Sequence, residues 1–403
     1  MIRLVPTKKQ LEYVVAGSFI IAGISGVIWI LTDQDPIRVA NGLGFDGVYY
    51  DRILRHLAAE GGLELPIAFP YCGRVGTPWI LAKVFHSHVG FFGFNLVVSV
   101  LFSATLLLAT HSLWRGSLKG LTAVVAASSF LYFAPVKFTN FYPVYMDPPF
   151  LLILSFCLLL IINREYLLAS AICMSGIPFR EASFYLLPLF LSFYIKNAER
   201  KRAALVISLF IILAGYVTKG LILSEFDCEY QSQLFTGLFW LYRFLSEPAH
   251  VLGSLAAISL TLGPLYIVLN KEAVKHVQWN GAVIFSAAAS VYCASLAIVG
   301  GSDVTRIFYS FLPLYVPLLI ASFRASSLTS FALACFGWML TNQMLHTYEQ
   351  PISDGPNNDL SGFFAQFPDY AHPTIALVIL VIWIILAMLR RLIEPLERHL
   401  PSE

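Results

Sequence analysis

Long apolar runs, separated by short polar segments, repeat along the whole of this 403-residue chain. A run of about 20 apolar residues can cross a bilayer as a helix, and shorter runs suffice where Gly or Pro interrupts them. The pattern therefore predicts an all-α, polytopic membrane protein with roughly twelve spans (11–13) in a single integral membrane domain over residues 1–403. We place the spans near 11–31, 89–110, 118–136, 148–162, 166–178, 182–195, 203–223, 250–270, 279–299, 305–322, 326–345 and 373–390.

Two of these runs are shorter than a bilayer requires. Residues 166–178 and 182–195 are joined by the polar stretch GIPFREAS, so they form either two spans or one re-entrant pair. Irregular backbone at membrane depth is stable only where protein or water covers it. The first run, 11–31, is longer than a signal-peptide core, and we expect it to stay as a membrane anchor.

The composition agrees with a membrane protein. Hydrophobic residues make up 58% of the chain and charged residues 12%, whereas soluble domains carry roughly 25% charged residues. The net charge is only +2, and the basic residues are scattered in short clusters. We therefore expect contacts with membrane lipids and no nucleic-acid partner.

The placement of the basic residues predicts a topology. Sixteen of the 26 Lys and Arg residues lie in alternate short loops and tails, which the positive-inside rule assigns to the cytoplasm. We therefore expect a multi-pass protein of the inner (plasma) membrane with both termini cytoplasmic and the acidic loops external. The cytoplasmic set is Arg3, Lys8, Lys9, Arg115, Lys119, Arg164, Lys196, Arg200, Lys201, Arg202, Lys271, Lys275, Arg324, Arg390, Arg391 and Arg398.

The longest external loop, residues 32–88, separates the first two spans. Its stretches VYYDRILRHLAA and WILAKVF place apolar residues at helical spacing, which is typical of short amphipathic helices on a membrane surface. In the external segment 224–249, QLFTGLFWLYRFL predicts another such helix. A third external segment, 346–372, is rich in Pro, Gly, Asn and Asp and predicts a loop.

Asp46 is the candidate catalytic residue of the first loop. In a helix that begins there, Asp46 shares a face with Tyr49 and Tyr50, whereas Asp51 lies about 140° around the axis and has its own helical partner in Arg55. The two carboxylates would not converge, which argues against a shared metal site. We predict no cofactor and no bound metal, although the sequence leaves a divalent metal open. The alternative role for Asp46 is that of a helix N-cap.

Two further residues near the external surface could contact a substrate. Arg74, in PYCGRVGTPWI, could hold two phosphate oxygens with its planar guanidinium. Its alternative role is to extend toward lipid headgroups. Asp147 precedes a pair of prolines that can open the next helix, so its simplest role is that of a cap.

Charged pairs also lie at the external ends of two later spans. Arg180 and Glu181 are adjacent between apolar runs, so each needs its own partner or a cavity. Asp303 and Arg306, three residues apart, could form a surface salt bridge. Alternatively, Asp303 caps a helix and Arg306 reaches into the membrane region toward an anionic ligand. In the predicted topology all these groups lie on one face of the membrane.

The six cysteines show no spacing typical of a metal site. Four of them lie in apolar runs, where Cys behaves as a small hydrophobic residue. Only Cys72 and Cys228 lie in polar loops, where a disulfide between them is possible, but we favour two unpaired thiols. The four apolar positions are Cys157, Cys173, Cys293 and Cys335.

Taken together, the order of these features resembles the GT-C class of membrane glycosyltransferases. FDGVYYDRIL is similar to the acidic and aromatic stretch that opens their first external loop. YCGRVGTPWILA is similar to their Tyr-Arg-x-Arg-hydrophobic-Leu-x-Pro segment, and GGSDVTRIFYSFLP to their Ser-Asp-x-x-Arg...Pro segment. Arg74 and Pro78 match the second motif, but Cys72 stands in place of its first Arg and Gly76 in place of its Leu. This departure bears on how the donor phosphate is bound.

The resemblance implies inverting transfer of a sugar from a polyprenyl-phosphate donor to an acceptor hydroxyl, of a lipid, glycan or protein, at the external face. Arginines would stabilise the phosphate leaving group, and Asp46 would accept the hydroxyl proton. The expected site comprises Asp46 as the catalytic residue, with Tyr49, Tyr50, Asp51, Arg74, Asp147, Arg180, Glu181, Asp303 and Arg306 as substrate-binding residues.

Two other functions share parts of this pattern. A transporter or flippase for a lipid-linked or anionic substrate would also have many spans and a broken helix pair, but it would place charges nearer the midplane or on both faces. A polymerase or ligase for lipid-linked oligosaccharides would work through a large late external loop. Segment 346–372, which has no Arg or Lys, does not suit that role.

Overall fold

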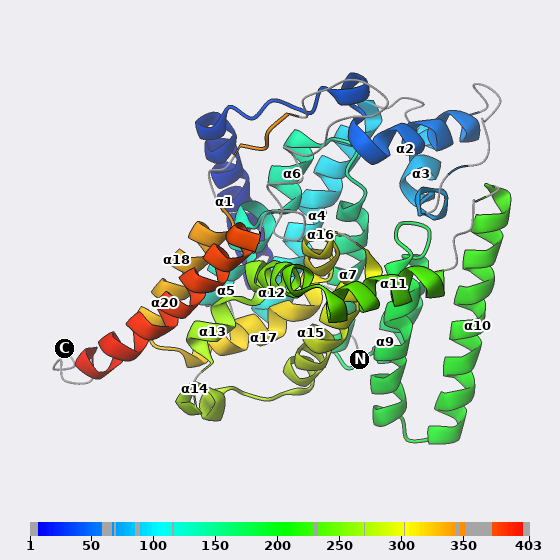
Figure 1. The fold of residues 1–403 in the computed structure, drawn as a ribbon. Helices are drawn as coiled ribbons and strands as arrows, with labels where there is room; N and C mark the ends of the chain where they lie inside the picture. Colours follow the sequence, from blue (N-terminus) through cyan, green and yellow to red (C-terminus); the bar gives the residue numbers. More distant parts are fainter. Residues whose placement is uncertain are drawn as a thin grey trace.

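The computed structural model describes residues 7–58, 67, 70–84, 89–114, 117–226, 228, 233–269, 271–301, 303–343, 347–350 and 373–397. Every regular element within these residues is a helix, which confirms the all-α class (Figure 1). Six helical segments are long and apolar enough to cross a bilayer, so the chain is a multi-pass membrane protein. They are α1 (Lys8–Thr32), α4 (Val89–Trp114), the segment Leu118–Phe141, α10 (Lys201–Glu225), α15 (Gly281–Gly300) and α20 (Pro373–Glu397).

Shorter apolar helices complete the bundle, and the total of twelve spans stays a prediction. Helices α7 (Asp147–Ile162) and α17 (Leu312–Ala325) lie in the interior, because both are apolar around nearly their whole circumference and most of their side chains are buried. Helix α7 packs against α4, α8 (Tyr166–Ser175) and α17, and α17 packs against α15. Helices α8 and α9 (Ala182–Asn197), which form the predicted pair at 166–195, pack against each other.

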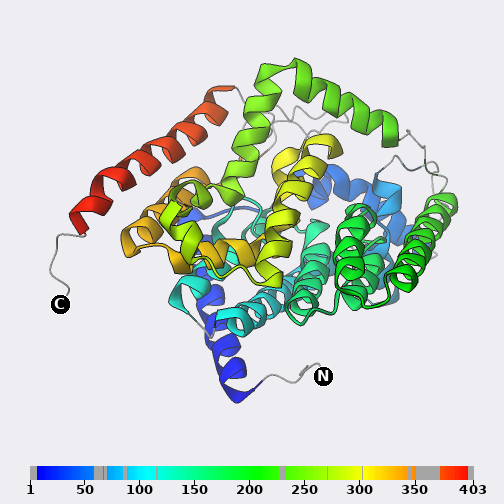
Figure 2. The same cartoon turned by 90° about the horizontal axis from the view of Figure 1, so that it is seen from below.

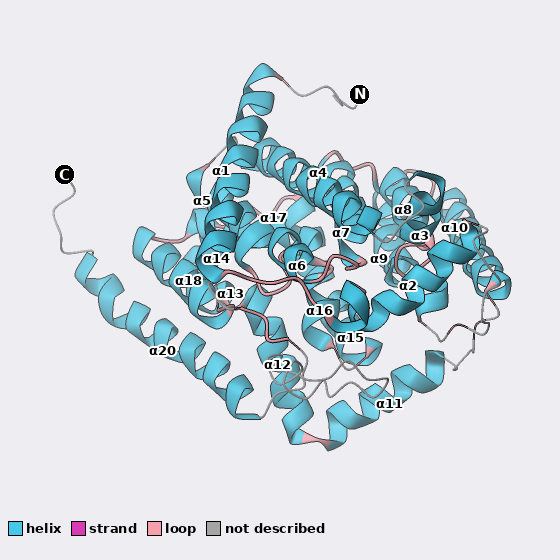
Figure 3. Cartoon of the chain, turned by 90° about the horizontal axis from the view of Figure 1, so that it is seen from above, coloured by secondary structure: helices cyan, strands magenta, loops and turns pink. Residues whose placement is uncertain are grey.

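Three helices lie on the outside of the bundle with large apolar side chains turned outward. Only 11% of the most apolar part of α10 and 17% of that of α1 is buried in the protein, compared with 78% for the segment Leu118–Phe141. Exposed apolar surface of this extent fits a lipid environment. Helix α20 runs along the outer edge in both end views (Figures 2 and 3) and is held by Trp383, whose indole contacts Gly263 and Gly337.

Three predicted spans are broken rather than continuous. The span predicted at 118–136 consists of α5 (Leu118–Val125), a π-helical turn (Ala126–Phe130) and α6 (Pro135–Phe141). The span at 250–270 divides into α12 (Pro248–Leu262) and α13 (Pro264–Val268), and that at 305–322 into α16 (Val304–Tyr309) and α17. A proline stands at or near the start of each new helix, where its missing N–H costs no internal hydrogen bond. Helices α14 (Lys271–His276) and α18 (Leu328–Thr341) follow α13 and α17, respectively, in the sequence.

The first loop forms the helices that the sequence predicts. Helix α2 (Gly44–Leu57) and helix α3 (Gly76–Val84) pack together across one end of the bundle, at the top of Figure 1. Two short 3-10 turns, η1 (Val39–Gly42) and η2 (Tyr71–Gly73), precede them. The helix predicted at QLFTGLFWLYRFL is α11 (Gln233–Ser246). The loop predicted at 346–372 lies outside the described residues except for 347–350.

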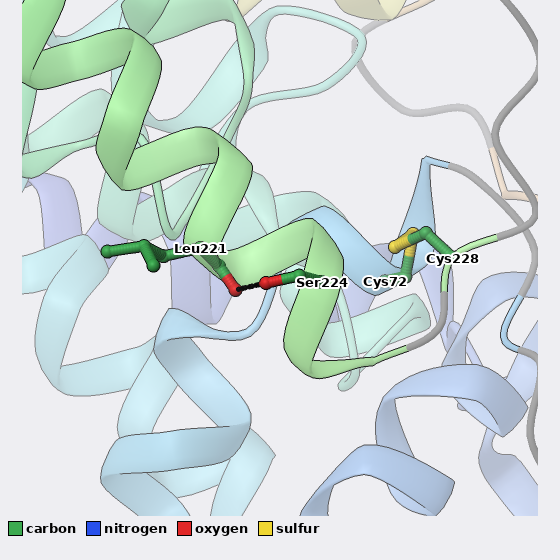
Figure 4. The surroundings of a disulfide bond; sticks show 4 residues. All are labelled: Cys72, Leu221, Ser224 and Cys228. Carbon is green, nitrogen blue, oxygen red and sulfur yellow. Dashed lines mark hydrogen bonds between the residues drawn. A yellow bond between two sulfur atoms is a disulfide. The ribbon is translucent and has the colours of Figure 1, made fainter.

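The expectation that Cys72 and Cys228 remain unpaired is wrong. The two residues form a disulfide between η2 and the chain just beyond α10 (Figure 4). They are 156 positions apart in the sequence, and their Cα atoms lie 5.8 Å apart. Loop residues without local pattern carry no signal of such a distant partner. The disulfide ties the segment that leads to Arg74 to the end of an outer helix.

Replacing both cysteines, as Cys72→Ser with Cys228→Ser, should lower the stability of the protein. The disulfide closes a loop of 156 residues, and native disulfides typically contribute about 2–5 kcal/mol. Thermal unfolding in detergent measures the loss. The matched control is Cys335→Ser, because Cys335 is a free, partly buried thiol. Equal melting temperatures for the double variant and the control would contradict the prediction.

Candidate active site

Asp46 lies in the first turn of α2, where Tyr142 takes over the role of a cap. The Tyr142 hydroxyl accepts the backbone N–H groups of Asp46 at 3.1 Å and Gly47 at 2.9 Å. The tyrosine ring can approach because Gly44, at φ +66°, has no side chain in its way. These two of the N-terminal amides are thus satisfied without the Asp46 carboxylate. Asp46 is therefore not the N-cap of α2, and its side chain is available for other contacts.

The Asp46 carboxylate is one end of a chain of ion pairs that crosses four segments of the sequence. Arg306 of α16 reaches Asp46 Oδ2 with Nη1 at 3.4 Å and Asp147 Oδ2 with Nε at 2.7 Å. The other oxygen of Asp147 is paired with Arg180, which precedes α9. Asp147 is therefore the shared counter-ion of two arginines, and α7 does not use it as a cap.

A second ion pair lies beside the first through the adjacent residue Glu181. Arg74 binds Glu181 with two parallel hydrogen bonds, Nε to Oε2 at 2.9 Å and Nη2 to Oε1 at 2.6 Å. Its Nη1 donates a longer bond, 3.4 Å, to the Tyr50 hydroxyl. The Arg74 side chain is only 11% exposed, so it does not extend toward headgroups. As predicted, Arg180 and Glu181 point to separate partners.

The Arg74–Glu181 pair fixes the charge of the glutamate. Burial by itself would raise the pKa of Glu181, but the charge and hydrogen bonds of Arg74 outweigh burial and lower this pKa to about 2. Glu181 therefore carries its negative charge at every physiological pH. The bidentate pair sets the orientation of the Arg74 guanidinium and leaves one edge of it toward Tyr50.

Asp303 caps a helix, which was one of the two roles predicted for it. Its Oδ1 accepts the backbone N–H of Arg306 at 3.0 Å and so caps α16, while the Arg306 guanidinium turns to Asp147 and Asp46. Asp51 pairs with Arg55 one turn along α2, with Oδ2 and Nε 2.8 Å apart. The divergence of Asp46 and Asp51 is therefore confirmed, and Asp51 pairs with an arginine outside the cluster.

Within the part of the chain that the structure describes, some polar atoms of the cluster already have partners, and others do not. Asp147 is 2% exposed and both of its oxygens are paired, whereas Asp46 is 18% exposed and has one long contact. Arg306 Nη2 is buried without a hydrogen-bond partner among the described residues. Asp46 is therefore able to receive a proton, and Arg306 Nη2 and Arg74 Nη1, whose bond to Tyr50 is long, are among the donors able to bind an anion.

Aromatic rings surround the cluster, and some of them were not predicted. Tyr49 stacks on Tyr71 with ring centres 4.5 Å apart, and the Arg306 guanidinium lies 5.3 Å from the centre of the Tyr145 ring. Tyr142 and Tyr145 stand in NFYPVYMD, directly before Asp147, so proximity to a site residue was the available signal. Their contacts with α2 and α16 join positions far apart in the sequence, which no local pattern reveals.

The donor set shows no preformed metal cage. Among the residues that the structure describes, no group of three or more His, Cys, Asp or Glu side chains is arranged to hold a metal ion. The carboxylates of the cluster face guanidinium groups instead. The chemistry that these residues offer is proton transfer at a carboxylate and binding of an anion by N–H donors.

The chain was also compared with known proteins. No protein-family model, no curated protein and no solved structure matches it significantly. The resemblance to GT-C enzymes therefore stays a prediction from the three motifs.

Glu181→Gln should destabilise the protein by about 3 kcal/mol near neutral pH, the lower range for removing one partner of a buried ion pair. The pKa of Glu181 falls from an ordinary 4.5 to about 2 on folding. Its contribution is therefore complete above the ordinary pKa and is lost as the pH falls toward 2. The difference in melting temperature between the variant and wild type should be constant from about pH 5 to 8 and shrink below that range. A difference that shrinks above pH 5 instead would contradict this assignment.

Proposed function

We propose that this chain is a membrane glycosyltransferase that moves a sugar from a polyprenyl-phosphate donor to an acceptor hydroxyl, with inversion at the anomeric carbon. One observation carries the proposal. Residues from four distant segments form a connected cluster in which a partly exposed carboxylate, Asp46, lies beside a guanidinium with an unpaired N–H, Arg306. A base next to an anion-binding donor is what this reaction requires.

In the proposed reaction, the acceptor oxygen attacks the anomeric carbon of the donor. The C–O bond between the sugar and the phosphate breaks, and its electron pair stays on the phosphate. Asp46 accepts the proton of the attacking hydroxyl, a role that typically accelerates such steps about 10²–10⁴-fold. Arg306 Nη2 and Arg74 Nη1 supply hydrogen bonds to the phosphate oxygens as negative charge develops there.

Asp147 and Glu181 act on the reaction through the arginines. In the proposal, Asp147 holds Arg306 and Arg180 in place, and Glu181 holds Arg74. These paired guanidinium groups would not reorganise when the donor binds, so their donors are preorganised. Tyr49 and Tyr71 provide stacked rings, a type of surface that suits the apolar face of a sugar. The cluster thereby divides into groups that touch the donor and groups that position them.

The disulfide supports an external location for this site. Disulfides persist in oxidising compartments outside the cytosol, and Cys72 is two residues from Arg74. The positive-inside pattern independently favours the external side for the loop that contains α2 and α3. In the donor-binding segment, where related motifs have a first Arg, this chain has the disulfide cysteine. We therefore assign the donor phosphate to Arg74 and Arg306.

Replacing Asp46 by Asn should reduce transfer at least about 10²-fold, because the base is lost. The assay measures transfer from a panel of polyprenyl-phosphate sugars by the purified protein. Asp51→Asn is the matched control, since Asp51 lies on the same helix but pairs with Arg55. It should retain turnover. Undiminished turnover by Asp46→Asn would remove Asp46 as the base. If the wild type uses no donor of the panel but moves such lipids between leaflets, the chain is a transporter.

Arg306→Lys should lower kcat about 10²–10³-fold, the range found when one stabilising donor of a transition state is removed. Lysine keeps the charge, but its N–H groups all lie on one nitrogen, whereas the guanidinium reaches Asp147 and Asp46 through two nitrogens and offers the third to the donor. The control Arg55→Lys replaces an exposed arginine of α2 whose partner is Asp51. Steady-state kinetics with varied donor distinguish the two variants. Equal kcat values would exclude a role for Arg306 at the leaving group.

A further inference from the structure

A groove on the lipid-facing side of the bundle runs between α1, α4 and α6. Its wide part has a volume of about 290 Å³. The residues that α1 and α4 contribute to the lining are mostly apolar or small. They include Ile21, Ala22, Gly26, Leu96 and Val100. None of its lining residues belongs to the ion-pair cluster of the candidate active site. The mostly apolar lining and the volume of this part of the groove suit a hydrocarbon chain.

One end of this groove is polar. A second, narrower pocket shares Ser25, Trp29, Val136 and Asn140 with the first and is therefore continuous with it. Its other lining residues include Thr32, Gln34 and Lys137. Thr32 and Gln34 mark the C-terminal end of α1, which runs toward the end of the bundle that carries α2 (Figure 1). From Ser18 to Thr32 the groove follows α1 for about 21 Å.

Lys137 is the cation at the polar end. Its residue is 9% exposed, and its Nζ donates one long hydrogen bond, 3.4 Å, to the Gln343 carbonyl. It lies over the rings of Tyr132 and Tyr348, 5.9 Å and 5.2 Å from their centres. None of the ion pairs of the described residues includes Lys137. Lys137 lies in the candidate span Leu118–Phe141, and a lysine in a membrane span without an ion-pair partner is costly and marks a functional site by default.

Asn140 adds a second donor to the same end. It is three residues from Lys137 on α6, so both side chains lie on one face of the helix. Both also line the narrow pocket. An ammonium and an amide side by side match the oxygens of a phosphate.

We propose that this groove binds an anionic phospholipid, with the phosphate on Lys137 and Asn140 and one acyl chain along α1 and α4. A free anion would use only the polar end, and a neutral lipid would leave the charge of Lys137 unmatched. A long apolar slot that ends at a buried cation favours a ligand with both a hydrocarbon chain and a negative charge. The site is separate from the cluster at Asp46, so it does not rest on the proposed glycosyl transfer.

The test compares lipid binding by wild type and Lys137→Met in a neutral detergent. Phosphatidylglycerol should raise the wild-type melting temperature in a saturable way, because a ligand that binds only the folded state stabilises it. Native mass spectrometry should show one retained lipid. In Lys137→Met the apparent affinity should fall about tenfold, as expected for the loss of one charge-assisted hydrogen bond.

Three controls separate the contributions of charge, chain and fold. Lys119→Met removes a lysine of α5 that donates hydrogen bonds to the carbonyls of Phe323 and Ser326. This variant should bind phosphatidylglycerol with the affinity of the wild type. Lys137→Arg should retain binding. Ala22→Trp fills the slot from an exposed position of α1 and should weaken binding without touching the polar end. It also serves as the test if Lys137→Met does not fold.

Three results would overturn the proposal. The first is an unchanged affinity for phosphatidylglycerol in both Lys137→Met and Ala22→Trp. The second is equal stabilisation by phosphatidylcholine, which would remove the role of the lipid charge. The third is a full response to glycerol 1-phosphate at the same concentration, which would show that the headgroup alone occupies the site.

Discussion

The buried carboxylate of Asp147, shared by Arg180 and Arg306, is the interaction on which the functional end of this protein depends. An uncompensated charge in a protein interior costs several kcal/mol, so two arginines on different helices must both reach the single acid at the start of α7. Arg306 then extends the network to Asp46, and the residue after Arg180, Glu181, extends it to Arg74. One central acid thus aligns α2, α7, α9 and α16 at one end of the bundle.

In the proposed function, the small number of unpaired groups would make the cluster selective. Most carboxylate oxygens and guanidinium nitrogens in it already have partners, so an incoming ligand meets a few defined donors and one accessible acid. The groove between α1, α4 and α6 differs from the cluster, because its lysine is in none of the ion pairs of the described residues and it continues as a mostly apolar slot. In the two proposals, the first site binds a reacting phosphate and hydroxyl, and the second binds a lipid through its charge and its acyl chain.

Local patterns in the sequence predicted the helices and many of the charged groups. The amphipathic stretches became α2, α3 and α11, and the pairing of Asp51 with Arg55 followed from helical spacing alone. Prediction failed for the breaks in the spans and for the disulfide. The spans at 118–136, 250–270 and 305–322 are broken before Pro135, Pro264 and Pro313, and Cys72 finds Cys228 across 156 positions. The prolines at these breaks are a local signal that the span prediction did not use, because the apolar runs continue across them. The partner of Cys72, in contrast, cannot be read from residues within one or two turns.

By itself, then, the amino-acid sequence determined the class of protein, the helices, and which ionisable residues were too costly to be left in apolar surroundings. It determined these because hydrophobicity and helical periodicity act over a few residues. Only the tertiary structure decided which charges meet, that Tyr142 and not the Asp46 side chain caps α2, and that Lys137 ends a groove without an acid beside it. Those outcomes depend on side chains from helices that are far apart in the sequence, and a partner at such distance leaves no local trace.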